Sequence, residues 1–102
     1  MIHVIATIEL RPGLRGAFLA EFERIVPTVL AEAGCIEYGA TVDLDTGLER
    51  QAPLREDVVV ILEKWKNVAA LKAHLNAAHM AAYRDRVGDL VTGFTLHILE
   101  PV

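Results

Sequence analysis

Residues able to do chemistry gather in one short stretch, EKWKNVAALKAHLNAAHMAAY, at residues 63–83. It holds the only tryptophan of the chain, Trp65, and two of its four histidines, His74 and His79. A neutral imidazole can take a proton from a phenol near neutral pH, and an indole offers a broad flat face to an aromatic ring. These residue types predict a pocket in which His74 is a general base and Trp65 stacks on an aromatic molecule.

Neighbouring side chains extend this candidate pocket, and structural roles stay open for each of them. Glu63 shares the sheet face of Trp65, where its carboxylate is a candidate to bind substrate, a helix histidine or a residue across an interface. Tyr38 and Tyr83 are candidates to line the same cavity with their hydroxyls. Plain core packing of Trp65, and a hydrogen bond from His74 to a neighbour, are the alternatives to the pocket.

A regular helix would keep the two histidines apart. At 100° per residue, His74 falls at one border of the apolar stripe and His79 at the other, roughly 140° away. They cannot share a metal unless the helix breaks near Asn76, and no cysteine or carboxylate completes a ligand set at a recognised spacing. We therefore expect no metal site. His79 remains a candidate for substrate binding or for anchoring the last helical turn.

Other reactive groups give no further site. His3 and His97 alternate along outer strands and are expected to be structural or interfacial, and Cys35 is expected to be a small buried residue. No glycine-rich phosphate loop supports a nucleotide or a flavin, and no serine nucleophile motif is present. The motifs therefore give no support for a nucleotide or flavin cofactor or for a serine nucleophile.

Composition excludes several classes of protein. A chain of 102 residues suits one domain over 1–102. The net charge of −4, without a basic cluster, argues against nucleic acid, and no run of about 18 apolar residues predicts a membrane span. The N-terminal MIHVIATIEL alternates like a strand and lacks the charged start of a signal peptide. With one cysteine, these features predict a cytoplasmic protein.

The first half of the chain predicts a strand, a helix and a second strand. Residues 2–10 alternate as a half-buried strand, and apolar residues at spacings of three and four over 14–33 predict a helix. Its apolar face comprises Leu14, Phe18, Phe22, Ile25 and Val29. Pro27 should kink or break this helix, and Gly34 should end it. The second strand is expected at 35–43, with Ile36, Tyr38, Ala40 and Val42 on one side.

The second half predicts a long loop at 44–56, a strand at 58–65, a helix and a last strand at 92–100. The apolar run that opens the strand at 58–65 predicts a central strand covered on both faces. Asn67 is the expected cap of the helix, whose buried stripe comprises Val68, Leu71, Leu75, Ala78 and Ala82. Gly88 should stop it.

This β-α-β-β-α-β order predicts an α+β, ferredoxin-like antiparallel sheet with both helices on one face. The other face would be bare on a single chain. Because 53% of the residues are hydrophobic, above the roughly 45–50% of soluble domains, we expect a second copy to cover that face in a symmetric homodimer.

Three blocks of this sequence, in this order, resemble the antibiotic biosynthesis monooxygenase family. EAGCIEY at 32–38, EKW at 63–65 and HLNAAHMAAY at 74–83 are similar to E-P-G-C-x-x-Y, E-x-W and H-x-x-x-x-H followed by an aromatic residue. The resemblance covers the whole chain. Ala33 stands where the family usually has proline, and the 44–56 loop is longer than usual, which affects the pocket mouth.

The resemblance implies a dimeric α+β barrel and a cofactor-independent monooxygenase of the quinol type. Such an enzyme oxidises a quinol, or a related phenolic or polyketide aromatic, with O₂, and the substrate is itself the electron source. A non-catalytic ligand-binding or regulatory dimer is the alternative. Haem degradation is disfavoured, because relatives with that activity carry an asparagine in the first strand and IHVIATIEL has none.

Overall fold

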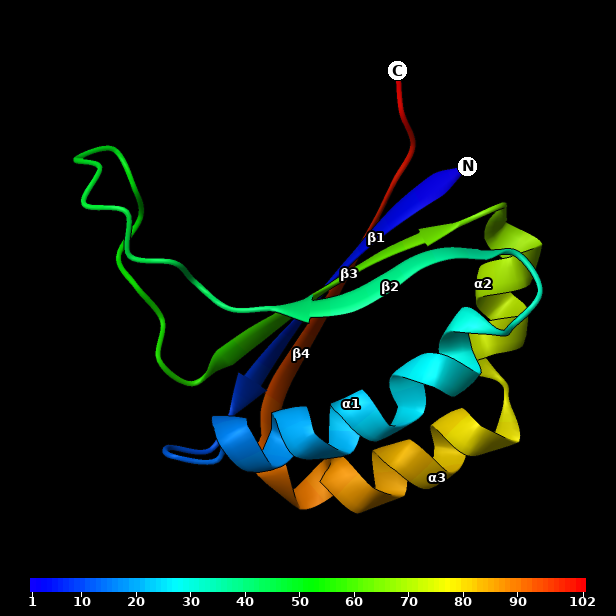
Figure 1. Cartoon of the computed structure of the whole chain (residues 1–102), viewed down its shortest axis with the longest axis horizontal. Coiled ribbons are helices and arrows are strands. Elements are labelled where there is room, and N and C mark those ends of the chain that lie inside the picture. Colours follow the sequence, from blue (N-terminus) through cyan, green and yellow to red (C-terminus); the bar gives the residue numbers. More distant parts are fainter.

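The computed structural model describes all 102 residues (Figure 1). Its strands and helices follow the predicted order, except that the second helix is in two pieces. The elements are β1 (Ile2–Leu10), α1 (Arg15–Leu30), β2 (Cys35–Thr41), β3 (Val58–Trp65), α2 (Val68–Leu75), α3 (Ala78–Val87), a 3₁₀ turn (Gly88–Leu90) and β4 (Val91–Leu99). None of the helices combines the length and the apolar character that a membrane crossing needs.

The four strands form one antiparallel sheet in the order β2-β3-β1-β4. All helices lie on one face of it, below the sheet in Figure 1, and the opposite face carries none. This α+β arrangement confirms the predicted ferredoxin-like fold. The predicted periodicities set the core: alternate β1 residues from Val4 to Leu10 are buried against the α1 face of Phe18, Phe22, Ile25 and Val29.

Pro27 does not break α1, so the prediction of a break at this residue was wrong. The helix continues through Pro27 to Leu30, and the Pro27 carbonyl still accepts a hydrogen bond from the Ala31 N–H at 3.2 Å. Proline here removes one bond close to the end of the helix, where few later turns depend on it. Gly34 then turns the chain into β2 with a φ of 81°. A side chain there would meet Ala70 Cβ at 2.6 Å, so both backbone and packing require glycine.

The predicted single second helix was also wrong. It breaks at Asn76–Ala77, where Ala77 is extended and starts α3. The Asn76 side chain donates to the Lys72 carbonyl at 3.0 Å, which closes α2 with a local bond in place of another helical turn. Asn67 does cap α2, since its Oδ1 accepts from the Ala70 N–H at 2.9 Å.

The break also changes which residues of the second helix are buried. In the predicted stripe only Leu71 is buried, whereas Val68, Ala78 and Ala82 are exposed. In α3 the buried residues are Met80, Tyr83 and Val87.

Two strand predictions need correction. A register shift between Cys35 and Glu37 interrupts the alternation of β2, and Ile36 is 53% exposed. The strand β3 is interior to the sheet as predicted, but only its helix side is covered. On its other side Leu62 is 41% exposed, because the open face has no covering layer in a single chain.

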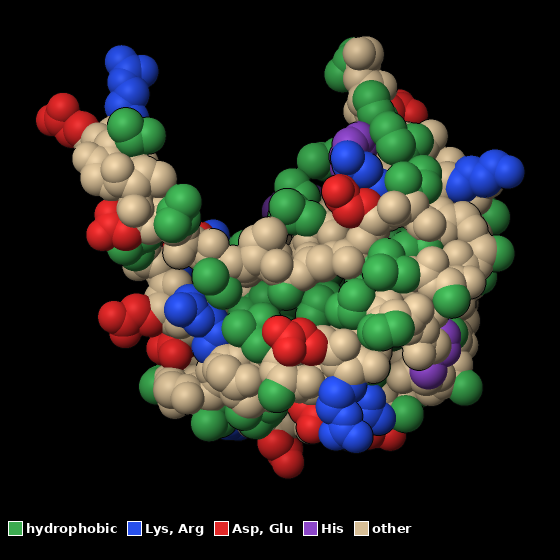
Figure 2. Space-filling model, viewed as in Figure 1, with side chains coloured by type: hydrophobic (Ala, Val, Ile, Leu, Met, Phe, Trp, Pro, Cys, Tyr) green, Lys and Arg blue, Asp and Glu red, His purple; other side chains and the backbone are tan.

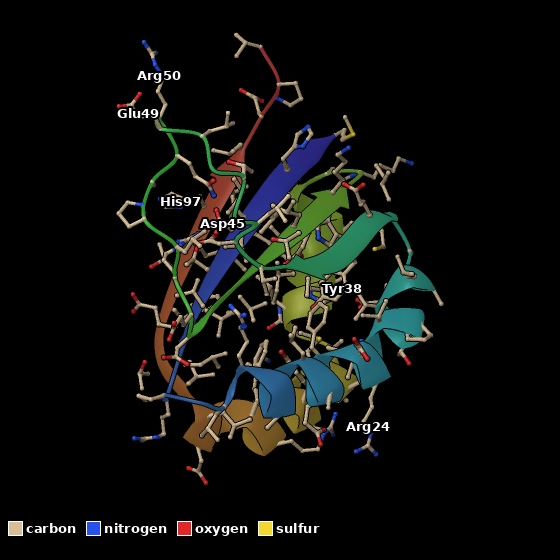
Figure 3. The ribbon with its side chains drawn as sticks, turned by 60° about the vertical axis from the view of Figure 1, so that its left-hand side comes forward. Arg24, Tyr38, Asp45, Glu49, Arg50 and His97 are labelled. Atoms are coloured by element: carbon tan, nitrogen blue, oxygen red, sulfur yellow. The ribbon has the colours of Figure 1, made fainter.

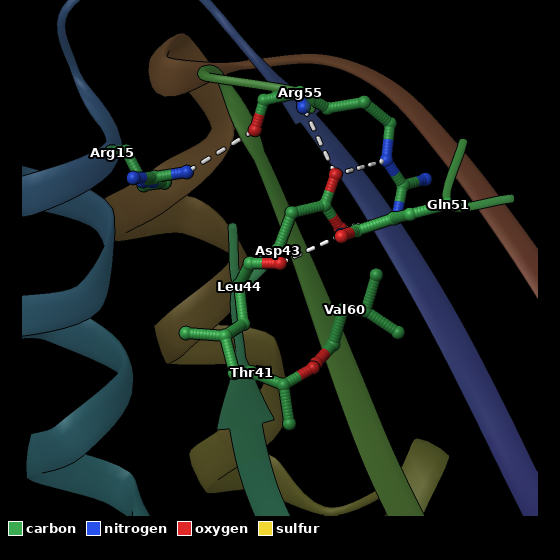
Figure 4. A network of polar contacts seen from close by, with 7 residues as sticks. All are labelled: Arg15, Thr41, Asp43, Leu44, Gln51, Arg55 and Val60. Carbon is green, nitrogen blue, oxygen red and sulfur yellow. Dashed lines mark hydrogen bonds and ion pairs between the residues drawn. The ribbon is translucent and has the colours of Figure 1, made fainter. Parts of the chain in front are cut away.

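The 44–56 loop is an arm that stands away from the body (Figures 2 and 3). Figure 4 shows polar contacts at the base of the arm. The Arg55 guanidinium donates two hydrogen bonds to the Asp43 carboxylate, at 2.9 and 3.0 Å, and Arg15 donates one to the Arg55 carbonyl. The guanidinium lowers the pKa of Asp43 to about 2. Gln51 donates to the Leu44 carbonyl at 2.6 Å and closes the arm on itself.

Candidate active site

A cavity of about 360 Å³ lies between the inner face of the sheet and the helices. Twelve of its 16 lining residues are hydrophobic, Tyr38 and Tyr83 among them, so a ligand there is held mainly by apolar contacts. The polar groups of the wall are the hydroxyls of these two tyrosines and the side chains of Glu63, His74 and Arg84. The mouth of the cavity lies between α3 and β4, where three of its lining residues are exposed: Arg84, Gly88 and Phe94.

Strand pairing brings Tyr38 and Glu63 together in the cavity wall. They are direct partners in the β2–β3 ladder and both are buried on the helix side. The Tyr38 ring stacks on Phe22 of α1 at 5.2 Å, and Figure 3 shows it pointing from β2 into the space between sheet and helices. The prediction that Glu63 shares the sheet face of Trp65 is confirmed, since both are buried on the helix side.

His74 is buried, not on the border of a helical stripe. Its exposed fraction is 1%, and its ring packs on Trp65 at 4.6 Å and on the edge of Tyr38 at 5.5 Å. Nδ1 lies 2.8 Å from Glu32 Oε2. An ionised carboxylate only accepts, so the neutral ring carries its proton on Nδ1. Nε2 makes no hydrogen bond within the chain, which leaves its lone pair for the cavity that His74 lines.

Glu32, in the turn between α1 and β2, is the functional residue that sequence reasoning missed. The same oxygen that holds His74 also lies 3.0 Å from His79 Nε2. The helix break at Asn76 turns both histidines toward this carboxylate. The expectation that the histidines stay apart and that no carboxylate joins them was therefore wrong. The available signal was the position of Glu32 as the first residue of EAGCIEY.

Trp65 and His79 do not line the cavity. Trp65 has no exposed surface and donates its Nε1–H to Glu63 Oε1 at 2.8 Å. The predicted stacking on a ligand was therefore wrong, and Trp65 instead supports the two polar residues in front of it, Glu63 and His74. His79 lies on the outer side of Glu32 with its side chain 34% exposed.

Burial decides the protonation of the cavity's acidic groups. Burial raises the pKa of Glu63, the nearby charge of Glu32 raises it further, and the Trp65 hydrogen bond and His74 oppose the shift. Burial also raises the pKa of Tyr38 and of Tyr83 well above the ordinary value of 10.0. Both phenols therefore stay protonated near neutral pH, so each has an O–H to donate.

The remaining reactive residues stand apart from this cavity. His3 and His97 lie on β1 and β4 and line no part of it. Cys35 is half-buried, and burial raises the pKa of its thiol, which argues against a thiolate nucleophile. A proton acceptor in the cavity is thus supplied by His74, with hydroxyl donors around it.

Comparison with known proteins decides the family. The family model described as "Antibiotic biosynthesis monooxygenase" matches residues 1–86.

The chain belongs to the antibiotic biosynthesis monooxygenase family.

The family match extends from β1 nearly to the end of α3 and includes Glu32, Tyr38, Glu63, His74 and Tyr83. A relative from Escherichia coli, "Probable quinol monooxygenase YgiN", is 43% identical over 99% of this chain and 98% of its own. The Bacillus subtilis protein "Putative monooxygenase YcnE" is 36% identical over 90% of this chain and 87% of its own. The solved structure of PA3566 from Pseudomonas aeruginosa superposes with a TM-score of 0.80 at 26% identity. That match covers 99% of this chain and 93% of the other.

Proposed function

We propose that this family member is a monooxygenase that oxidises a quinol, or a related phenolic aromatic, with O₂ and without a cofactor. The observation that carries the proposal is the Glu32–His74 pair, with the unpaired Nε2 of a buried imidazole at an apolar cavity. The names of the E. coli and B. subtilis relatives support it. The cavity volume of about 360 Å³ lies near the lower end of small-molecule sites, which favours an aromatic of one or two rings.

In the proposed reaction the cavity deprotonates the quinol and excludes water. His74 Nε2 accepts a hydroxyl proton, and the charge of Glu32 stabilises the imidazolium that forms. Tyr38 and Tyr83 donate hydrogen bonds to substrate oxygens, which orients the ring. The apolar wall keeps the reactive phenolate away from bulk solvent.

Electrons for this reaction come from the substrate. One oxygen atom of O₂ bonds to a ring carbon and the other leaves as water, so a naphthohydroquinone and O₂ give a hydroxynaphthoquinone and water. The quinol supplies the four electrons that reduce O₂. This balance requires no flavin, haem or nicotinamide.

We also propose that the protein is a homodimer joined through the open sheet face. Polar and apolar residues share this face, and its apolar residues include Ile5, Val58, Val60, Leu62 and Leu99. In Figure 2 the face is seen edge-on as a saddle between the arm and the C-terminal segment. A surface of this kind matches a second copy of itself about a two-fold axis.

Oxygen uptake by chelator-treated protein, given a panel of quinols, tests the proposed reaction. We expect saturable uptake above the enzyme-free rate for naphthohydroquinones, and none for their dimethyl ethers, which have no proton to give. With oxygen-18-labelled O₂, one labelled atom should enter the product. Saturable binding of the same quinols without enzyme-dependent uptake would instead establish a ligand-binding protein.

A further inference from the structure

Three potential metal ligands converge behind the cavity from different parts of the chain. Glu32 Oε2, His74 Nδ1 and His79 Nε2 all lie within 4.8 Å of one another. Each ring nitrogen is at hydrogen-bond distance from the same carboxylate oxygen, at 2.8 and 3.0 Å. Two imidazoles and one carboxylate are a ligand set that Zn²⁺ takes in proteins, with a fourth position left open.

We propose that Glu32, His74 and His79 form a binding site for a divalent transition metal such as Zn²⁺, and that the bound metal switches off His74 as a base. The second clause rests on the proposed function, whereas the first stands on the ligand geometry alone. Imidazole ligands select Zn²⁺ and its transition-metal neighbours over Mg²⁺ and Ca²⁺, which prefer oxygen.

The cluster must rearrange locally to accept a metal. Tetrahedral ligands at 2.0–2.1 Å lie about 3.3 Å apart, so each nitrogen must move from the carboxylate oxygen by roughly half an ångström or less. The two nitrogens, which lie within 4.8 Å of each other, must also settle at about 3.3 Å. His79 has room for this adjustment, because its side chain is 34% exposed and lies early in α3. The same exposure lets water take the fourth position.

Charge around the cluster favours a cation. Glu32 itself is a carboxylate, and Glu63 is close enough that its charge interacts with both Glu32 and His74. Burial of His74 and of most of Glu32 keeps water from weakening this attraction.

Metal binding would invert the hydrogen-bonding state of His74. A neutral imidazole has one N–H and one lone pair. In the metal-free protein Nδ1 carries the proton toward Glu32, and Nε2 offers the lone pair to the cavity. A metal at Nδ1 binds through a lone pair on that nitrogen. The one proton of the neutral ring must then sit on Nε2, where it faces the substrate. The loaded protein therefore has no imidazole lone pair in the cavity to accept a proton.

Direct binding measurements test the site without reference to turnover. Chelator-treated protein is titrated with Co²⁺, whose visible d–d absorption reports its coordination, and with Zn²⁺ by calorimetry. We expect one saturable site per chain with imidazole coordination. His79→Gln should weaken binding about tenfold or more. The control His97→Gln removes a histidine from β4, away from the cluster, and should bind as the unaltered chain does. Equal binding by His79→Gln and His97→Gln, or no saturable binding, would overturn the site.

Quinol-dependent oxygen uptake tests the switch. Saturating Zn²⁺ should lower the rate of the unaltered protein and of His97→Gln by about tenfold or more. His79→Gln, compared with its own metal-free rate, should need a Zn²⁺ concentration for half-inhibition that is higher by the same factor by which its binding is weakened. An unchanged rate while the site is demonstrably filled would overturn the switch. If no protein oxidises a quinol even without metal, the proposed function fails, while the binding titration still decides the site.

Discussion

His74 Nδ1 lies 2.8 Å from Glu32 Oε2, although 42 residues separate the two in the chain. The bond joins α2 to the turn before β2 and fixes the ring so that its other nitrogen is left for the cavity. A carboxylate in this position sets the tautomer and stabilises the imidazolium, as it does for histidine bases generally. The first prediction concerns this contact.

Replacing Glu32 by glutamine should lower kcat about 10–100-fold with a smaller change in KM. The amide oxygen can still accept the Nδ1–H, but it carries no charge to stabilise the imidazolium. Unfolding by urea should show a loss of about 1 kcal/mol, because a hydrogen bond to a charged acceptor is replaced by one to a neutral acceptor. The exposed Glu37→Gln is the control and should change neither quantity. A full rate for Glu32→Gln would exclude the carboxylate from the mechanism.

Glu63 makes the stability depend on pH. The pKa of Glu63 in the folded chain is raised above the ordinary 4.5. At pH values between 4.5 and this raised pKa, the folded protein therefore holds more protons than the unfolded one. The free energy of unfolding therefore falls as pH rises through that window. Glu63→Gln keeps an oxygen for the Trp65 N–H and should remove this part of the slope. Urea denaturation at a series of pH values measures it, and identical slopes for both proteins would refute the assignment.

Removing the Tyr38 hydroxyl should weaken substrate binding more than folding. Tyr38→Phe keeps the ring stacked on Phe22 and takes away one donor, so we expect KM to rise by a factor of about 3 to 10, the equivalent of one ordinary hydrogen bond. Since burial raises the pKa of this phenol, its loss should leave the alkaline limb of the pH–rate profile unchanged. If that limb moves, Tyr38 takes part as a base.

The open sheet face should make the protein dimeric. Sedimentation should give about twice the chain mass of 11.2 kDa at micromolar concentration. Leu62→Lys places a charge on that face and should yield monomers, since a buried unpaired charge opposes association. Ala82→Lys, on the exposed side of α3, is the matched control and should stay dimeric. Monomeric unaltered protein would rule out this interface.

Much of the fold was predictable because its elements carry clear periods. The alternation of β1 and the three-and-four spacing of α1 identified the buried residues on both. The shared face of Glu63 and Trp65 followed from their two-residue spacing in β3. These are local patterns, and local patterns survive tertiary packing when they agree with it.

The errors lie where a local pattern meets a long-range contact. HLNAAH contains neither proline nor glycine, so a regular helix was the natural assumption, and that assumption separated His74 from His79. The actual break rests on the Asn76 side chain and on Arg84 Nη2, which donates to the Leu75 carbonyl at 3.0 Å. Glu32 escaped notice because its partners lie more than 40 residues later.

Trp65 illustrates a second limit of sequence reasoning. Its position at the end of an interior strand fits a wall of the cavity and a layer behind that wall equally well. The structure places it behind Glu63, to which it donates a hydrogen bond.

The measurement that tests the central claim most directly is oxygen uptake by chelator-treated His74→Gln protein with a naphthohydroquinone as substrate. The account predicts a rate roughly 10²-fold or more below that of the unaltered protein. Because His74 is buried and bonded to Glu32, a loss of about 1–3 kcal/mol of stability should accompany it, so circular dichroism must first show that the variant is folded. A folded His74→Gln protein that oxidises the quinol at the unaltered rate would contradict the account.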